Sequence, residues 1–173
     1  LIADAELLER IEAQAAQLVA LEPGPTTEVI GRSAAIKADV VSKDERESGL
    51  RMLLNYGHTI GHAIEQSTGY GTYLHGEAVA IGMRAAAAIA RELGMLSTTE
   101  EARQAQAIRR FGLPEVAAVD PASVLAALQF DKKVRAGAVR WVLLDGIGKA
   151  RVESGVPAEV VDRAVRLVAT PSA

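Results

Sequence analysis

The spacing of apolar residues constrains this chain more than any other feature of its sequence. Within residues 1–21, apolar side chains recur three or four positions apart, which lines them up on one helix face (Leu7, Leu8, Ile11, Ala15, Leu18, Leu21). The same spacing predicts further helices over residues 26–43, 50–66, 75–93, 99–111, 121–130 and 157–168. Segment 75–93 is rich in alanine, so neighbouring elements can approach it closely. We therefore expect this helix at the centre of the fold.

One segment departs from the helical pattern. Residues 139–144 and 149–153 are short and β-branched, and Gly146 and Gly148 between them can supply the positive φ angles of a tight turn, which predicts a β-hairpin. The chain has no evident repeat or low-complexity linker, and 173 residues suffice for one ordinary domain. The sequence therefore predicts a single, mainly α, multi-helix domain over residues 1–173 with a small β-hairpin.

Composition excludes several classes of protein. An apolar content of 49% argues against intrinsic disorder, and a net charge of −3 argues against a general nucleic-acid or membrane-surface binder. No uncharged apolar run reaches the roughly 18 residues of a membrane span, and no secretory signal begins the chain, so we expect a cytoplasmic protein. The chain has no Cys, which excludes disulfides, thiolate zinc sites and Cys nucleophiles.

Four ligand-capable side chains gather in the segment 51–62. On a continuous α-helix, Arg51, Asn55, His58 and His62 fall within a stripe of roughly 60°. Ordinary surface helices favour Lys, Glu and Gln on their polar face rather than Asn and two His. Two glycines in the same segment, at positions 57 and 61, each cost about 1 kcal/mol in a helix interior, and close approach of another helix or a ligand would offset that cost.

The histidines suggest a metal site. His58 and His62 stand at i and i+4, the spacing with which zinc peptidases bind their ion, but Thr59 occupies the position of the peptidase's general base, which disfavours that class. His75 opens the next predicted helix after a glycine-rich turn and can fold back over His58. Two or three imidazoles would then converge on one ion. The alternative is that these are structural histidines that only make hydrogen bonds.

Two further cationic positions are candidates for binding an anionic substrate group. Lys37 lies among apolar residues in the predicted helix 26–43, and Lys132 and Lys133 follow an apolar helix just before the hairpin. The alternative for each is a solvated lysine, since amphipathic helices show Lys to solvent and basic residues commonly end helices favourably.

Several ordered blocks of this sequence closely resemble the 3-dehydroquinate synthase family. They are KADVV (37–41), DERE (44–47), GLR (49–51), LNYGHT (54–59), GHAIE (61–65), LHGEAVAIGM (74–83), DKK (131–133) and GIG (146–148). The resemblance covers essentially the whole chain. It implies conversion of 3-deoxy-D-arabino-heptulosonate 7-phosphate to 3-dehydroquinate and phosphate in the shikimate pathway, the route to chorismate and the aromatic amino acids. It also implies a lyase that uses NAD catalytically and one divalent ion, Zn²⁺ or Co²⁺.

The resemblance also implies roles for individual residues. His58 and His75 would bind the metal ion, and His62 would contact the substrate and help to move protons. Lys37 and Arg51 would bind the substrate carboxylate. The phosphate would be bound by Asn55 and by Lys132 or Lys133, between which the sequence does not choose.

The chain departs from the family pattern at its beginning. The family's third metal ligand is a Glu at the start of the helical part, and a nucleotide-binding domain precedes it, but this chain contains no Gly-rich strand-to-helix phosphate motif. The chain also begins at Leu1 within a helical pattern. We therefore expect the C-terminal half of a longer enzyme, inactive alone, whose partners are the sugar-phosphate substrate, the missing N-terminal NAD-binding domain and a second subunit in a homodimer.

Three alternatives remain at this point. A related sugar-phosphate cyclase, of the inosose or valiolone synthase type, would act on a substrate without a carboxylate, and retention of Lys37, Arg51, Asn55 and His62 favours the dehydroquinate enzyme. An iron-type alcohol dehydrogenase would have a similar fold but different sequence blocks. A non-catalytic metal-binding helical domain is the alternative from another class.

Overall fold

The structure is a computed structural model that describes residues 1–44, 49–134 and 139–171, without the side chains of residues 131–134. Its helices are α1 (Ala5–Ala13), α2 (Ala15–Val19), α3 (Pro23–Lys43), the 3₁₀ helix η1 (Leu50–Asn55), α4 (His58–Ser67), α5 (His75–Glu92), α6 (Thr98–Arg110), α7 (Pro121–Val134) and α8 (Ala158–Val168). Its strands are β1 (Ala117–Ala118), β2 (Arg140–Leu144), β3 (Ala150–Ser154) and β4 (Ala169–Thr170). The predicted mainly α fold with a small hairpin is confirmed.

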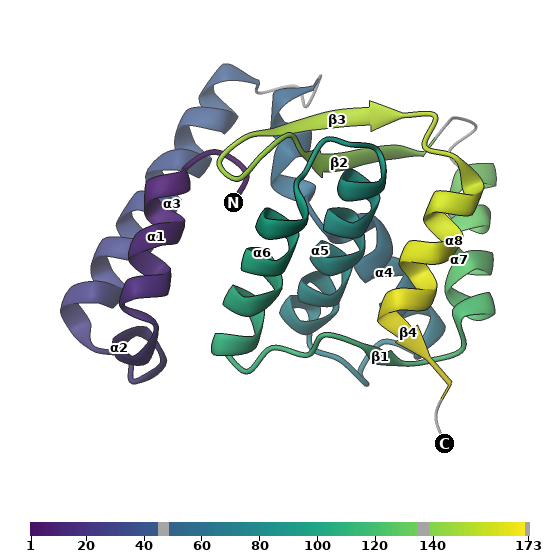
Figure 1. The fold of residues 1–173 in the computed structure, drawn as a ribbon, viewed down its shortest axis with the longest axis horizontal. Helices are drawn as coiled ribbons and strands as arrows, with labels where there is room; N and C mark the ends of the chain where they lie inside the picture. The colour runs from purple at the N-terminus through teal and green to yellow at the C-terminus, as the bar shows by residue number, and fades with distance from the viewer. Residues whose placement is uncertain (45–48, 135–138, 172–173) are drawn as a thin grey trace.

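Helix α5 lies at the centre of the molecule. It packs against α4, α6, α8 and β2, while α1 and α3 lie together at one side and α7 lies at the other (Figure 1). The side chains of Ala78, Ile81, Ala85 and Ile89 are completely buried along α5. The expectation that small residues place this helix centrally is confirmed, because a helix buried all round must let neighbours approach from several directions.

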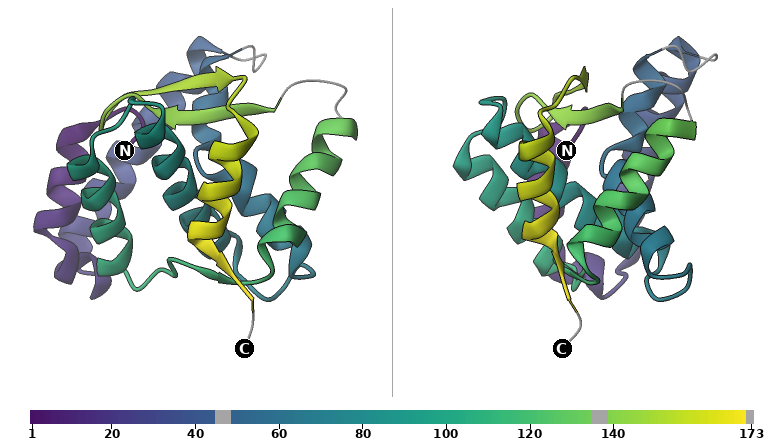
Figure 2. Two further views of the ribbon diagram at one scale, coloured as in Figure 1. Left: turned by 45° about the vertical axis from the view of Figure 1, so that its right-hand side comes forward. Right: turned by 90° about the vertical axis from the view of Figure 1, so that its right-hand side faces the viewer.

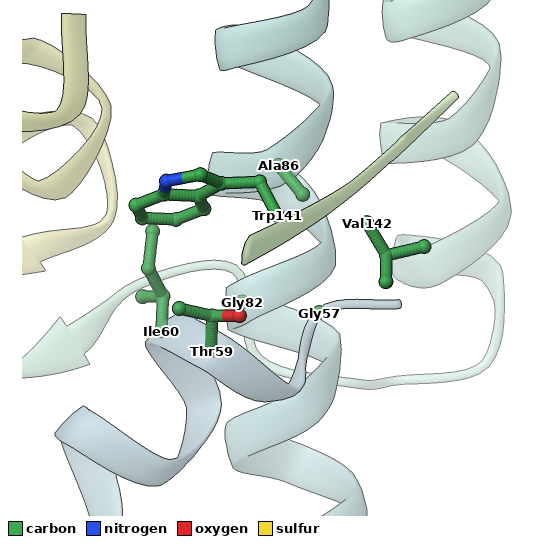
Figure 3. Close-up of a pocket in the computed structure, with 7 residues that line it drawn as sticks. All are labelled: Gly57, Thr59, Ile60, Gly82, Ala86, Trp141 and Val142. Atoms are coloured by element: carbon green, nitrogen blue, oxygen red, sulfur yellow. The ribbon is translucent and has the colours of Figure 1, made fainter. Parts of the chain in front are cut away.

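Glycines set the spacing between α4 and α5. A Cβ added to Gly82 would lie 2.0 Å from the carbonyl oxygen of Gly57, and one added to Gly61 would lie 3.1 Å from the carbonyl oxygen of Ala78. Figure 3 shows Gly57 and Gly82 side by side, with Trp141 of β2 over Ile60. The close approach expected from the two glycines of the histidine segment is therefore confirmed.

The hairpin covers one end of the helices. Strand β2 pairs antiparallel with β3, Val142 opposite Val152, and all the views show the hairpin crossing the same end of the helical body (Figures 1 and 2). Gly146 and Gly148 adopt φ angles of 99° and 89°, as the turn prediction required. The amide of Gly148 also donates a 2.6 Å hydrogen bond to the Leu1 carbonyl, so the turn holds the first residues of the chain.

Three predictions about helices were wrong. The segment 1–21 is not one helix, because it breaks at Gln14 between α1 and α2. Helix α3 begins at Pro23 rather than at Thr26 or Thr27, because proline is tolerated in the first turn, where amides have no intrahelical acceptor. The segment 50–66 is not one helix either, because Gly57 adopts a left-handed φ of 83° between η1 and α4.

The short strands β1 and β4 were not predicted. They pair in parallel, Ala117 with Ala169 and Ala118 with Thr170, and so tie the segment before α7 to the end of α8. Two residues are too few to show the alternating pattern by which strands are found in sequences.

Candidate metal centre

Three histidines from two helices converge. His58 is the first residue of α4, His62 follows one turn later, and His75 is the first residue of α5. One ring nitrogen from each lies within 4.8 Å of the others, a separation at which imidazoles can share one ion. The expectation that His75 folds back over His58 is confirmed by their ring centroids, which are 5.2 Å apart.

Two of these imidazoles are oriented by an oxygen acceptor. His58 Nδ1 lies 3.3 Å from the carbonyl oxygen of Tyr56, and His75 Nδ1 lies 3.2 Å from Glu65 Oε1. Because a carbonyl and an ionised carboxylate only accept hydrogen bonds, each contact requires the proton on Nδ1 and leaves Nε2 free for a metal ion. This arrangement distinguishes His58 and His75 from His62.

The burial of His58 favours its neutral form. Partial burial lowers the pKa of His58 below its ordinary value, the Tyr56 carbonyl opposes this shift, and nearby positive charge on His62 or His75 lowers the pKa further. A metal ion binds neutral imidazole. The surroundings of His58 therefore favour the protonation state in which it can bind a metal ion.

The local backbone explains why His58 stands where it does. Gly57, in the left-handed region, separates η1 from α4, and no side chain of the described residues caps the start of α4. A Cβ at position 57 would lie 2.6 Å from Met83 Cγ of α5. Glycine therefore meets both a conformational and a steric requirement here.

The predicted polar stripe is divided by this turn. Arg51 and Asn55 lie on η1, whereas His58 and His62 lie on α4, so the four side chains do not share one helix face. The carboxylate of Asp44, a buried residue, accepts hydrogen bonds from the amides of Gly49 and Arg51, at 2.8 and 3.0 Å, and so fixes the start of η1.

The structure describes the side chain of only one of the remaining candidate lysines. Lys37 is exposed on α3, which packs against η1 and so stands next to the element that carries Arg51. Lys132 and Lys133 belong to the end of α7, and their side chains lie outside the described residues. The division of anion-binding work among these residues therefore stays a prediction.

Sequence reasoning missed Glu65 and Asp44 as residues of this site. Glu65 stands seven positions after His58 and three after His62, so an extension of the histidine face along α4 would have found it. Asp44 accepts hydrogen bonds from the amides of Gly49, just before η1, and Arg51 within it, and a sequence shows no comparable periodic signal for such contacts.

Comparison with known proteins agrees with this geometry. A family model described as 3-dehydroquinate synthase C-terminal matches residues 1–134. The chain belongs to the 3-dehydroquinate synthase family. It is 49% identical over 162 residues to the 3-dehydroquinate synthase of Nostoc punctiforme, and 47% identical over 158 residues to that of Nitrosomonas europaea.

The matches cover nearly all of this chain but under half of each relative. They span 91% of the chain, and 45% and 43% of the Nostoc and Nitrosomonas enzymes. Among solved structures, 2-epi-5-epi-valiolone synthase from Streptomyces hygroscopicus, with NAD⁺ and Zn²⁺ bound, superposes with a TM-score of 0.86 at 30% identity, over 96% of this chain and 47% of that one.

A second solved structure belongs to the same wider group of cyclases. It is 2-deoxy-scyllo-inosose synthase, complexed with carbaglucose-6-phosphate, NAD⁺ and Co²⁺, with a TM-score of 0.71 at 28% identity over 82% of this chain and 41% of that one.

Among the described residues of this 3-dehydroquinate synthase family member, we find no helix with the length and apolar character that a bilayer crossing needs.

Proposed function

We propose that this chain is the metal- and substrate-binding part of a 3-dehydroquinate synthase, which converts 3-deoxy-D-arabino-heptulosonate 7-phosphate to 3-dehydroquinate and inorganic phosphate. The observation that carries the proposal is the convergence of His58, His62 and His75, with the Nδ1 atoms of His58 and His75 held by oxygen acceptors. The identity of 44–49% to synthases of this name adds support.

The residues of the cluster fit a divalent ion. Imidazole nitrogens suit zinc and cobalt, and an outer carboxylate such as Glu65 is the usual partner of a metal-binding histidine. The two cyclase structures that resemble this chain contain Zn²⁺ or Co²⁺ together with NAD⁺. When bound, NAD supplies reversible hydride transfer and the metal ion supplies Lewis-acid polarisation of a substrate hydroxyl.

The histidines divide into two roles. His58 and His75 hold the ion through Nε2. His62 is exposed beside them, and its imidazole contacts the substrate and accepts or returns the proton of the reacting hydroxyl.

Further charged and polar residues of the chain bind the two anionic ends of the substrate. Arg51 offers two parallel hydrogen bonds to the carboxylate, and Lys37 adds a second positive charge. Asn55, with Lys132 or Lys133, hydrogen-bonds the phosphate oxygens. The contacts to the phosphate favour its loss by elimination, because the electron pair of the breaking C–O bond moves to the departing phosphate. The adjacent C–H bond gives up its proton, and its electron pair forms the new C=C bond.

The remaining parts of the enzyme lie in the half of the relatives that this chain does not cover. We assign to that half the NAD site and a third, carboxylate, metal ligand. This chain alone therefore does not turn over substrate, and the complete protein is a cytoplasmic homodimer.

A related cyclase activity is the second candidate, because the two solved structures compared above are such enzymes. The discriminating feature is the substrate carboxylate. A valiolone or inosose synthase acts on a sugar phosphate without one, and it gives Lys37 and Arg51 no partner.

Phosphate release tests the proposal. The full-length protein that carries this chain is assayed with NAD and zinc on the heptulosonate phosphate and, separately, on sugar phosphates that lack a carboxylate, with the isolated chain as control. We expect release from the heptulosonate substrate by the full-length protein alone. Release only from a substrate without a carboxylate would establish the second candidate, and no release from a folded, metal-loaded protein would overturn both.

A further inference from the structure

Gln104 of α6 is a polar residue placed entirely inside the protein. Its exposed fraction is 0%, and Asp44 is the other polar or charged residue that is buried in the described part of the chain. Both ends of its amide are used. Oε1 accepts a 2.6 Å hydrogen bond from the Tyr56 hydroxyl, and Nε2 donates a 2.8 Å hydrogen bond to the Met83 carbonyl.

Tyr56 connects this amide to His58. Its side chain is buried, and its hydroxyl donates the hydrogen bond to Gln104. Its backbone carbonyl lies 3.3 Å from His58 Nδ1. One residue thus anchors its side chain on Gln104 and uses its main chain to orient the imidazole that begins α4.

Met83 connects the same amide to the helix that begins with His75. Met83 lies on α5, whose first residue is His75. The Met83 carbonyl also lies 3.3 Å from the Tyr56 hydroxyl, so the three groups form a closed set of contacts. Gln104 therefore bridges the turn that presents His58 and the helix that presents His75.

We propose that Gln104 is a positioning residue of the metal centre, which acts through Tyr56 to hold His58 in register with His75. The inference rests on the metal site of the proposed function. An apolar side chain at position 104 would fill the same space, but it would not fix the orientation of the Tyr56 ring. The buried hydrogen bond to Gln104 fixes that orientation, because leaving either partner without a hydrogen bond would cost free energy.

A double-mutant cycle on metal affinity tests this role. Zinc dissociation constants are measured by chelator competition for the full-length protein and for its Gln104→Met, Tyr56→Phe and doubly substituted forms, together with unfolding temperatures. We expect about tenfold weaker zinc binding in each single variant, the lower end of the effect of removing an outer partner of a metal ligand. The double variant should bind no more weakly than the weaker single one, because both changes break one chain of contacts.

The matched control is Ile108→Ala, one turn further along α6. Ile108 is buried but makes no polar contact with the cluster, so its truncation lowers stability without changing zinc affinity by more than twofold. If Gln104→Met fails to fold, Tyr56→Phe, which removes one oxygen and keeps the ring, decides the question.

The outcomes are distinguishable. Unchanged zinc affinity in Tyr56→Phe, additive losses in the double variant, or an equal loss in Ile108→Ala would each overturn the positioning role while leaving the metal site intact. A wild-type protein that binds no zinc or cobalt would overturn the proposed function together with this inference.

Discussion

Glu65 Oε1 lies 3.2 Å from His75 Nδ1, so a carboxylate near the end of α4 orients the imidazole that begins α5. Glu65 is largely shielded, with 14% of its side chain exposed, whereas the His75 side chain is 57% exposed. The shielded partner therefore sets the position of the accessible one. This pair links the two helices beside the candidate metal centre and leads to the first prediction.

Replacing Glu65 should weaken metal binding without unfolding the protein. Because the carboxylate fixes the Nδ1 proton of His75, we expect Glu65→Ala to lower zinc affinity about 10–100-fold, and Glu65→Gln, which keeps an oxygen acceptor, to lower it less. Chelator competition measures both. The control is Glu101→Gln on α6, where a similarly shielded carboxylate pairs with Arg91 away from the cluster. Equal affinities for Glu65→Ala and the wild type would contradict the assignment.

Alanine substitutions should distinguish the two proposed metal ligands, His58 and His75, from His62. His58→Ala and His75→Ala each remove a proposed ligand, so their loss of zinc affinity should exceed that of any Glu65 variant. His62→Ala should retain zinc and lose at least about 100-fold in kcat, the scale of one general acid–base group. Zinc content by atomic absorption and phosphate release measure the two effects. Loss of zinc from His62→Ala would instead make His62 a third ligand.

Arg51 should govern substrate binding. Arg51→Ala removes charge-assisted hydrogen bonds of about 1.5–3 kcal/mol, so KM for the heptulosonate phosphate should rise about 10–150-fold. Arg51→Lys, which keeps the charge but not the paired geometry, should fall between. Steady-state phosphate release measures KM. Arg166→Ala, which breaks an exposed ion pair with Asp162 on α8, is the control and should leave KM unchanged.

The contact between Gly57 and Gly82 should tolerate no side chain. Gly82→Ala places a Cβ 2.0 Å from the Gly57 carbonyl oxygen, which must push α4 from α5 and should cost about 3 kcal/mol or more of unfolding free energy. Gly31→Ala on α3 is the control, because no atom of the described residues lies within 4 Å of its added Cβ, and it should stabilise by about 0.5–1 kcal/mol. Urea unfolding compares the two, and equal stabilities would contradict the prediction.

Glu100 should make stability depend on pH. Its carboxylate accepts hydrogen bonds from the Ser97 hydroxyl, the Ile147 amide and the Ser97 amide, and these hold the pKa of Glu100 below its ordinary 4.5. With the folded pKa below the unfolded one, the stabilisation is complete well above pH 4.5 and is lost as pH falls through and below that value. We expect Glu100→Gln to lose about 1 kcal/mol at pH 7 and to flatten this dependence in urea unfolding. A parallel pH dependence in the two proteins would contradict this role.

The sequence was most informative where one element carried its own signal. The small residues of α5 predicted its central place, Gly146 and Gly148 predicted the hairpin turn, and the turn before His75 predicted its return over His58. Each of these signals is local. A helical period or a turn residue therefore sufficed to find it.

The misplaced stripe shows where local signals end. Projecting Arg51 and Asn55 onto the histidine face assumed α-helical geometry throughout, whereas a 3₁₀ helix turns about 120° per residue and the left-handed φ of Gly57 ends the helical path. The turn is stabilised by Gln104, 48 positions from its partner Tyr56. Such a contact depends on how α6 packs against the centre of the fold, which no window of neighbouring residues contains.

The alanines at the centre of the fold change which core substitutions should be destabilising. A core of leucines is destabilised when its side chains are shortened. The side chains of Ala78, Ala85 and Ala88 on α5 are single methyl groups, and all three are buried by neighbouring residues. Enlarging these side chains should be destabilising, because close-packed protein interiors seldom have space for an added methylene group. At the buried alanines of α5, larger side chains should therefore be the destabilising ones. At Val165 or Leu143, smaller side chains should be.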